Sequence, residues 1–250
     1  FVNVNTMVSV EDLIRGIIVQ SGNDACIAIA EGISGSEALF AEELNLLAKE
    51  IGMINSSFTN STGWPDPDHL TTIQDLLTLT VRTIEDFPEL YYYYAEKEFT
   101  YSGIRQLNRN PLLFNEINAD GLKTGHTSLG GYGLVASVLK NNRRLILILN
   151  GLKRNKDRSN ESERLIKVGF NQYKVIDLYD QNQTITNLQV WGGRKKNVAV
   201  YSKESVNLTV PNRIKKDLVF TIKHYKPLLA PIEKDQKVAD CLLYTSPSPR

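Results

Sequence analysis

The spacing of apolar residues changes twice along this chain, and these changes limit the folds that it can adopt. Up to about residue 95, apolar side chains such as Leu13 and Ile17 recur at the spacing of amphipathic helices. From Glu96 they form short runs between Gly and Asn turns, as in strands, before a helical pattern returns over 160–173. Helices followed by a mostly antiparallel sheet and a closing helix predict an α+β fold, an α/β sandwich.

Element ends follow from capping and turn residues. Ser9 with Asp12, and Thr72 with Asp75, have the spacing of helix N-caps. We expect helices at 9–20, 25–30, 36–51, 72–87 and 160–173, and strands at 99–102, 121–127, 132–139 and 145–152. The segment 55–70 is rich in Asn, Ser, Thr, Gly and Pro, and is expected to be a loop.

After Tyr173 the helical signals stop. Short alternating runs at 190–191, 198–201, 206–210 and 218–224 predict a small all-β domain. The predicted organisation is therefore a first domain over 1–173 and a partial β-sandwich over 174–240.

Composition excludes several classes of function. The 250 residues carry a formal net charge of +1, so we expect no nucleic-acid partner, which would need a clustered basic face. Three dispersed histidines and two distant cysteines offer no metal-ligand spacing, and no glycine-rich phosphate loop occurs, so we expect no metal and no cofactor. Cys26 stands in an apolar helix and is expected to be a buried small side chain.

Both ends of the sequence differ from the rest. The chain starts at Phe1, and the last ten residues, from Cys241 to Arg250, read as the translation of a transposase sequencing adapter. We therefore expect a fragment truncated at both ends, and we exclude 241–250 from the reasoning on fold and function.

Two short motifs have a chemical interpretation. Ser21-Gly22-Asn23 lies between two helices, where a hydroxyl could relay a proton and a carboxamide could hold a peptide group. Lys123-Thr124-Gly125 is expected to open a strand. The two motifs together resemble those of active-site serine enzymes of the penicillin-recognising type. This resemblance implies that the Lys123 ammonium stands beside the Ser21 hydroxyl and helps to keep a neighbouring lysine neutral. Thr124 offers a hydroxyl to a carboxylate, and Gly125 keeps the strand edge open for an extended peptide. An ordinary helix cap and a solvated strand lysine remain the alternatives for these motifs.

Longer strings around these motifs resemble one family. The segments 19–28, 104–110 and 120–127, together with 131–137 and 160–163, closely resemble the low-molecular-mass D-alanyl-D-alanine carboxypeptidases of the penicillin-binding protein 5 and 6 type. The resemblance covers nearly all of 1–240, in order. It implies a β-lactamase/transpeptidase-like domain followed by a small all-β domain.

The resemblance also implies an activity and a set of site residues. Such enzymes remove the terminal D-alanine from peptidoglycan pentapeptide stems through an acyl-enzyme, bind β-lactams covalently, and act at the periplasmic face of the bacterial inner membrane. Carried over by motif, the catalytic residues are Ser21, Asn23 and Lys123. The substrate-binding residues are Thr124, Gly125, His126 through its backbone N–H, Arg158, and with less support Arg109.

The sequence departs from the family at one essential point. No Ser-x-x-Lys string in a family-like context precedes Ser21, so the fragment itself is expected to be inactive, and its membrane contact is expected only through a missing C-terminal anchor. A catalytically silent peptidoglycan-binding homologue is one alternative. A class A β-lactamase is another, although Glu42 and Glu43 lie on a helix and the loop 55–70 contains no glutamate. The run Tyr91 to Tyr94 is expected to be part core and part surface rather than a sugar-stacking face.

Overall fold

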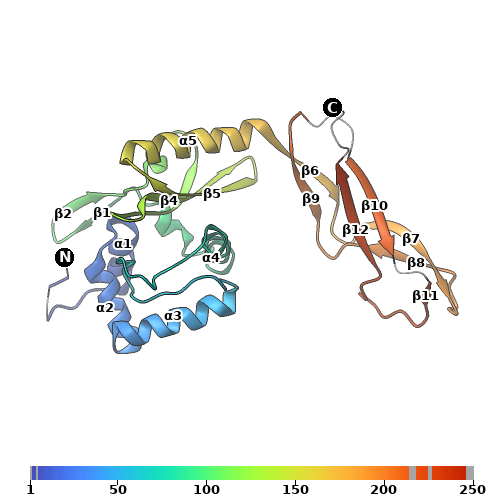
Figure 1. Ribbon diagram of the computed structural model, residues 1–250, viewed down its shortest axis with the longest axis horizontal. Helices are drawn as coiled ribbons and strands as arrows, with labels where there is room; N and C mark the ends of the chain where they lie inside the picture. The colour runs from blue at the N-terminus through green and yellow to red at the C-terminus, as the bar shows by residue number, and fades with distance from the viewer. Residues whose placement is uncertain (1, 4, 214–217, 225–226, 246–250) are drawn as a thin grey trace. The chain divides into compact units, whose positions relative to one another are not determined.

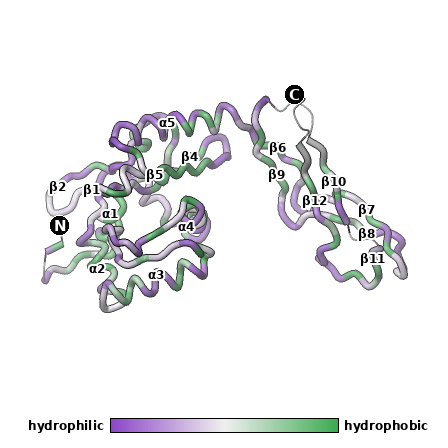
Figure 2. The backbone as a smooth tube through the Cα atoms, in the orientation of Figure 1, coloured by the Kyte–Doolittle hydropathy of each residue, from purple (hydrophilic) through white to green (hydrophobic). Residues whose placement is uncertain are grey.

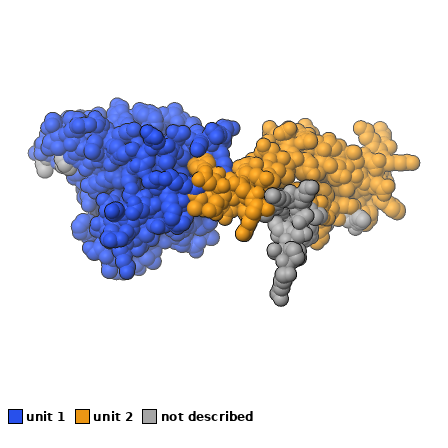
Figure 3. All heavy atoms as spheres, turned by 90° about the horizontal axis from the view of Figure 1, so that it is seen from above, with its two compact units in different colours: residues 1–167 blue, residues 168–250 orange. Residues whose placement is uncertain are grey.

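The structure, a computed structural model, describes residues 2–3, 5–213, 218–224 and 227–245. The chain divides into two compact units, Phe1–Lys167 and Val168–Arg250, which Figure 3 shows in different colours. We describe each unit by itself. The division at 173/174 expected from the sequence stays a prediction.

Four helices open the first unit, where the sequence predicts them. They are α1 (Val10–Gln20), α2 (Asn23–Ser34), α3 (Glu37–Ile51) and α4 (Ile73–Asp86). The hydroxyls of Ser9, Ser36 and Thr72 each accept a hydrogen bond from a backbone N–H three residues later. These caps satisfy donors that the first helical turn leaves unpaired, which explains why the helices begin there.

A three-stranded antiparallel sheet forms the centre of this unit. Its order is β3 (Ala119–Thr127), β4 (Gly131–Lys140) and β5 (Arg143–Leu152), so β3 lies at an edge. Figure 1 shows α5 on one face of the sheet and the earlier helices on the other, and Figure 2 shows the apolar stretches of β4 and β5 in green. The apolar side chains of Leu122, Leu134 and Val138 are almost fully buried. The predicted α+β arrangement is confirmed.

Short elements connect the helices to the sheet. They are the 3₁₀ helices η1 (Tyr91–Ala95) and η2 (Pro111–Phe114), and the hairpin of β1 (Glu98–Tyr101) with β2 (Ile104–Leu107). In η1, Tyr91 and Tyr93 are buried and Tyr92 is exposed, as expected for a run that is part core and part surface.

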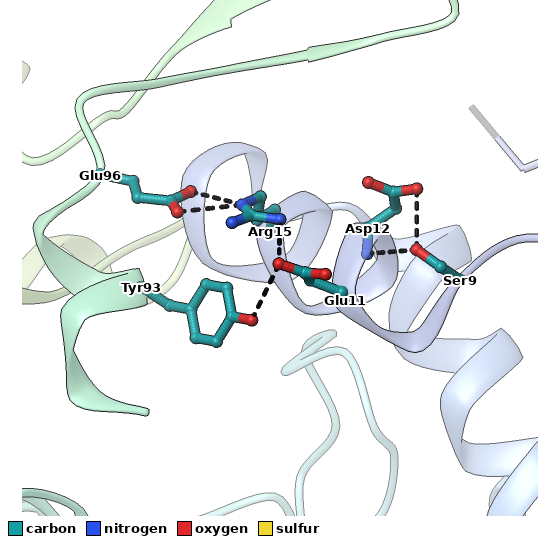
Figure 4. A network of polar contacts seen from close by, with 6 residues as sticks. All are labelled: Ser9, Glu11, Asp12, Arg15, Tyr93 and Glu96. Atoms are coloured by element: carbon teal, nitrogen blue, oxygen red, sulfur yellow. Dashed lines mark hydrogen bonds and ion pairs between the residues drawn. The ribbon is translucent and has the colours of Figure 1, made fainter. Parts of the chain in front are cut away.

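A polar network fixes α1 against η1 (Figure 4). The Nε of Arg15 donates to both carboxylate oxygens of Glu96 at 2.9 Å, and its Nη1 donates to Glu11 at 2.7 Å. The hydroxyl of Tyr93 donates to the same Glu11 oxygen at 3.1 Å. Because α1 ends directly before Ser21, this network also fixes where that serine lies.

The closing helix α5 (Asn155–Gln172) begins five residues before the expected start at Asn160. Its first turns are polar, from Asn155 through Asn160, so apolar periodicity could not reveal them. Arg158, expected before the helix, lies inside it. Tyr173, expected at the helix end, instead starts a strand.

The second unit begins with the last residues of α5, and from Tyr173 it is an all-β structure, as expected. Its strands are β6 (Tyr173–Tyr179), β7 (Thr184–Trp191), β8 (Asn197–Tyr201), β9 (Val206–Pro211), β10 (Leu218–His224), β11 (Leu228–Leu229) and β12 (Ala239–Thr245). They pair as β6–β9, β10–β12 and β11–β7–β8. Leu188, Leu228 and Val238 form a buried core, against which Val198 and Val200 of β8 pack.

The end of the chain that we excluded from the sequence reasoning takes part in this pairing. Cys241 lies opposite Ile222, and β12 continues to Thr245. Residues 246–250 lie outside the described part of the chain, and the adapter origin of 241–250 stays a prediction. Among the described residues, no helix has the length and apolar character needed to cross a membrane.

Candidate active site

Ser21 lies at the tight junction between α1 and α2. Its backbone is left-handed, with φ 55° and ψ 46°, and its N–H donates to the Ile17 carbonyl at 3.0 Å. A Cβ on Gly22 would lie 3.2 Å from the Asp24 carboxylate and 3.3 Å from the Gly16 carbonyl, so only glycine fits without adjustment. Asn23 then begins α2 with an exposed side chain.

Lys123 connects this junction to the sheet. Its ammonium donates a hydrogen bond to the hydroxyl of Ser21, 102 residues earlier in the sequence, and another to the Thr124 carbonyl at 3.0 Å. The two motifs that the sequence singled out therefore meet. Lys123 lies within β3 rather than at its start, because the strand extends back to Ala119.

The surroundings of Lys123 disfavour its charged form. Burial, with the positive charges of Arg109 and Arg158 nearby, lowers the pKa of Lys123 from an ordinary 10.5 to about 8. The amine therefore titrates close to neutral pH, where it can both give and accept a proton. A strongly shifted lysine next to a hydroxyl is typical of a functional site.

Arg158 is buried and has no acidic partner among the described residues. Its side chain is 6% exposed, and its Nη2 donates to Asn155 at 2.7 Å and to the Arg109 carbonyl at 3.4 Å. Its Nε is buried and has no hydrogen-bond partner in the described part of the chain. Burial lowers the pKa of Arg158. Since a buried unpaired guanidinium N–H is costly, this geometry suits a planar anion such as a carboxylate.

The last residues of β3 leave an open edge beside these groups. Thr124 is buried at 9% exposure, whereas Gly125 and His126 are exposed. A Cβ on Gly125 would contact nothing within 4 Å. Because no described strand pairs with the outer edge of β3, an extended peptide has room to add there.

Tyr132 joins the site, although the sequence reasoning did not assign it a role. It lies opposite His126 across β3 and β4, with the ring centroids 4.0 Å apart, and the Arg158 guanidinium lies 5.6 Å from its ring centroid. The sequence could have indicated this contact, because pairing the two predicted strands across their short turn places Tyr132 opposite His126. Asn155 was missed because its contact with Arg158 depends on the earlier start of α5.

Cys26 is less buried than expected from the sequence. It is partly rather than fully buried, and Lys123 lies close enough to act on it electrostatically. Burial nevertheless dominates and raises the pKa of the thiol. Cys26 is thus a neighbour of the site that remains a thiol.

The candidate residues form two neighbouring groups. Hydrogen bonds join Ser21, Lys123 and Thr124. Direct contacts join Arg158 to Arg109 and Tyr132, and Tyr132 to His126. The two groups lie close enough for the charges of Arg109 and Arg158 to act on Lys123. Asn23 lies two residues after Ser21, but its side chain has no hydrogen bond to another described residue.

Two further possibilities for site chemistry are absent from this part of the protein. Within the described ranges no cluster of three His, Cys, Asp or Glu side chains could hold a metal ion. The one Ser-x-x-Lys string in the sequence, Ser137 to Lys140, lies on strand β4. Ser137 is fully buried there and its hydroxyl accepts a hydrogen bond from Arg144, so it is not a nucleophile.

Comparison with known proteins gives consistent matches to one group. The family model described as D-alanyl-D-alanine carboxypeptidase matches residues 1–153, and that described as penicillin-binding protein 5, C-terminal domain, matches 173–245. The chain is 39% identical over 240 residues to the D-alanyl-D-alanine carboxypeptidase DacC of Escherichia coli, covering 95% of this chain and 60% of the relative. It is 41% identical to the D-alanyl-D-alanine carboxypeptidase DacA of Haemophilus influenzae, covering 84% and 54%.

Solved structures agree. Penicillin-binding protein 5 from Haemophilus influenzae superposes with a TM-score of 0.91 at 37% identity, covering 98% of this chain and 72% of that one. Penicillin-binding protein D2 from Listeria monocytogenes, in an ampicillin-bound form, superposes with a TM-score of 0.61 at 30% identity, covering 65% and 68%. The chain thus spans 54% to 60% of the length of these two curated relatives.

Proposed function

Since the chain belongs to the D-alanyl-D-alanine carboxypeptidase family, we propose that it carries two of the three catalytic motifs of a serine-type D-Ala-D-Ala carboxypeptidase. The whole protein would remove the terminal D-alanine from peptidoglycan pentapeptide stems through an acyl-enzyme. The observation that carries the proposal is the hydrogen bond between Lys123 and Ser21, made by a lysine whose pKa is lowered to about 8.

Lys123 and Ser21 act as a proton-transfer pair in this proposal. The amine lies against the hydroxyl, so a proton can pass between them without a large rearrangement. A lysine with a pKa of about 8 is easily deprotonated near neutral pH, yet its charged form still stabilises negative charge nearby. The pair would serve departure of the D-alanine amine and later activation of water. The attacking serine would come from a Ser-x-x-Lys helix outside these 250 residues.

The remaining residues would hold the substrate. Its peptide backbone would add to the open edge of β3 along Gly125 and His126, whose N–H would polarise the scissile carbonyl. The terminal carboxylate would bind the Thr124 hydroxyl and the Arg158 guanidinium, with Arg109 beside it. Asn23 would hold the substrate amide from the other side of the cleft. No metal or cofactor is needed for these steps.

This substrate class fixes the setting that we propose. Peptidoglycan stems lie outside the cytoplasmic membrane, so the protein would act at the periplasmic face of that membrane. β-Lactams, whose carboxylate and strained amide resemble the substrate terminus, would be covalent inhibitors.

The test uses the protein encoded by the full gene. Wild type should release D-alanine from a peptide that ends in D-Ala-D-Ala, and should release much less D-alaninamide from the same peptide with an amidated C-terminus. Arg158→Gln should reduce kcat/KM for the free-acid peptide about 10- to 100-fold, the value of a charge-assisted hydrogen bond, and leave the amidated peptide unaffected. Turnover of penicillin without D-alanine release would instead indicate a β-lactamase, and no reaction with either would indicate a silent homologue.

A further inference from the structure

Two large apolar side chains lie side by side on the surface of the second unit. Trp191 ends β7 and Leu229 ends β11, and the parallel pairing of these strands places the two residues opposite each other. Trp191 is 66% exposed and Leu229 is 64% exposed. The preceding pair, Leu228 with Val190, points into the core, where Leu228 is 9% exposed. Strand alternation therefore turns Trp191 and Leu229 outward together.

The backbone around this pair is held by hydrogen bonds. The Ala230 N–H donates to the Trp191 carbonyl at 2.9 Å, and the Val190 N–H donates to the Lys196 carbonyl at 2.8 Å. The turn between β7 and β8 passes through Gly192, whose φ is +74°, a conformation that favours glycine. The two exposed side chains thus stand on an ordered sheet end.

The turn beside them is strongly basic. Arg194, Lys195 and Lys196 are all exposed, and none has an ion pair with another residue in the described ranges. The stretch from Gln181 to Lys203 contains no aspartate or glutamate. Two acids of the neighbouring segment are already engaged, Asp235 by the Tyr201 hydroxyl and Asp240 by Lys237. We name Trp191, Leu229, Arg194, Lys195 and Lys196 the tryptophan–basic patch.

We propose that the tryptophan–basic patch docks on the surface of an anionic phospholipid bilayer. Tryptophan is suited to the boundary between headgroups and acyl chains, because its ring is apolar and its indole N–H is polar. Leu229 adds aliphatic area, which favours lipid over the face of a sugar ring. The three cations lie beside the apolar pair, where lipid phosphates would lie. One apolar contact combined with a polybasic cluster gives reversible binding rather than insertion.

This contact is independent of the proposed active site, which lies in the first unit, and it adds to the anchor expected from the sequence. The net charge of the chain is only +1, so the charge dependence of this contact would come from the local cluster of cations. The experiment must also distinguish a lipid bilayer from an anionic partner that is not a lipid, such as a wall polymer.

The chain contains two tryptophans, and this makes the test direct. Trp64 in the first unit is 67% exposed, matching Trp191 at 66%. The full chain carrying Trp64→Phe reports on Trp191 alone, and the chain carrying Trp191→Phe reports on Trp64 alone. With phosphatidylcholine vesicles containing phosphatidylglycerol, Trp191 emission should shift to shorter wavelength and resist acrylamide quenching. Trp64 emission should not change.

Charge and apolar contributions are then separated by sedimentation with the same vesicles. Changing Arg194, Lys195 and Lys196 together to Gln should lower the partition coefficient on the order of 100-fold, at about fivefold for each charge. The matched control changes Lys49, Lys153 and Lys156 to Gln, three exposed lysines of the first unit, and should bind as wild type. Leu229→Ser should weaken binding without altering the circular dichroism spectrum.

Several results would overturn the proposal. These are equal binding to pure phosphatidylcholine vesicles, equal emission shifts of Trp64 and Trp191, and equal losses in the patch and control triple variants. A Trp191 shift with soluble peptidoglycan fragments or an anionic wall polymer, but not with vesicles, would assign the patch to that polymer instead.

Discussion

Because the pKa of Lys123 is lowered in the folded chain, the stability of this chain should depend on pH, and this can be measured without any substrate. In the unfolded chain the amine titrates near 10.5, and in the folded chain near 8. Between these values the unfolded state holds a proton that the folded state has released. Stability therefore rises with pH across this window, because the unfolded state binds more protons there.

The size of the effect follows from the shift. At pH 7 the lysine is charged in both states and contributes almost no slope, and by pH 10 most of the difference has developed. Lowering the pKa from 10.5 to about 8 corresponds to at most about 3.4 kcal/mol, so the free energy of unfolding should gain about 2 to 3 kcal/mol from this residue between pH 7 and pH 10.

Lys123→Met isolates this contribution. Methionine fills a similar volume but carries no proton, so the variant should lack the gain. Tyr91, Tyr94 and Cys26, whose pKa values burial raises, give slopes of the opposite sign above about pH 8.5. Both chains keep the two tyrosines, so their contributions cancel in the difference between wild type and variant. Because Lys123 acts electrostatically on Cys26, both chains also carry Cys26→Ala, which removes the contribution of the thiol.

The assay is urea unfolding at pH 7, 8, 9 and 10, followed by circular dichroism at 222 nm. This signal reports mainly the first unit, since α1 to α4 and most of α5 lie there. The difference between wild type and Lys123→Met should increase toward pH 10 in favour of wild type. A difference that stays constant with pH would refute the interpretation that Lys123 is buried with a depressed pKa.

Three further predictions concern residues around β3. Gly121→Ala should destabilise the chain by about 1 to 3 kcal/mol, because the new Cβ would lie 2.6 Å from the Tyr91 hydroxyl. At Gly125 a new Cβ would have nothing within 4 Å, so Gly125→Ala should change stability by under about 0.5 kcal/mol, yet it should slow acylation of the full-length protein. Thermal unfolding and penicillin labelling distinguish these outcomes, and equal stability losses would contradict them. Asn110→Ala should cost about 2 kcal/mol or more in urea unfolding, because the fully buried amide donates to the Gly121 carbonyl at 2.8 Å and accepts from the Leu112 N–H at 3.1 Å; a neutral result would show that water replaces it. Arg144→Met should cost about 1 to 2 kcal/mol, since it leaves the half-buried Asp120 without its ion pair, and combining it with Asp120→Asn should cost less than the sum of the two single changes. Additive losses in that cycle would show that the pair is not coupled.

Patterns with a strong local cause were predictable from the sequence. The capping hydroxyls of Ser9 and Thr72 fix helix starts by local hydrogen bonds, and both helices begin where expected. The pairing of Ser21 with Lys123 was also expected, although nothing local joins residues 102 apart; that expectation came from the family resemblance.

Features that depend on tertiary contacts were not predictable in the same way. The polar first turns of α5 carry no apolar period, so Arg158 was expected before the helix, and the hydrogen bond from Arg158 to Asn155 was missed. Tyr173, the first residue of β6, was expected at the end of that helix, and the rest of β6 was not predicted as a strand, although its pairing with β9 is clear in the structure. The effect of Arg109 and Arg158 on the pKa of Lys123 required positions in space.

The central claim is that Lys123, held against Ser21, takes part directly in catalysis. The most direct measurement is the rate of covalent labelling of the full-length protein by fluorescent penicillin, for wild type, Lys123→Ala and Lys49→Ala, each with its circular dichroism spectrum. Lys123→Ala should label about 10²- to 10⁴-fold more slowly with an unchanged spectrum, and Lys49→Ala, an exposed lysine of α3, should label as wild type. Labelling of Lys123→Ala at the wild-type rate would contradict the account.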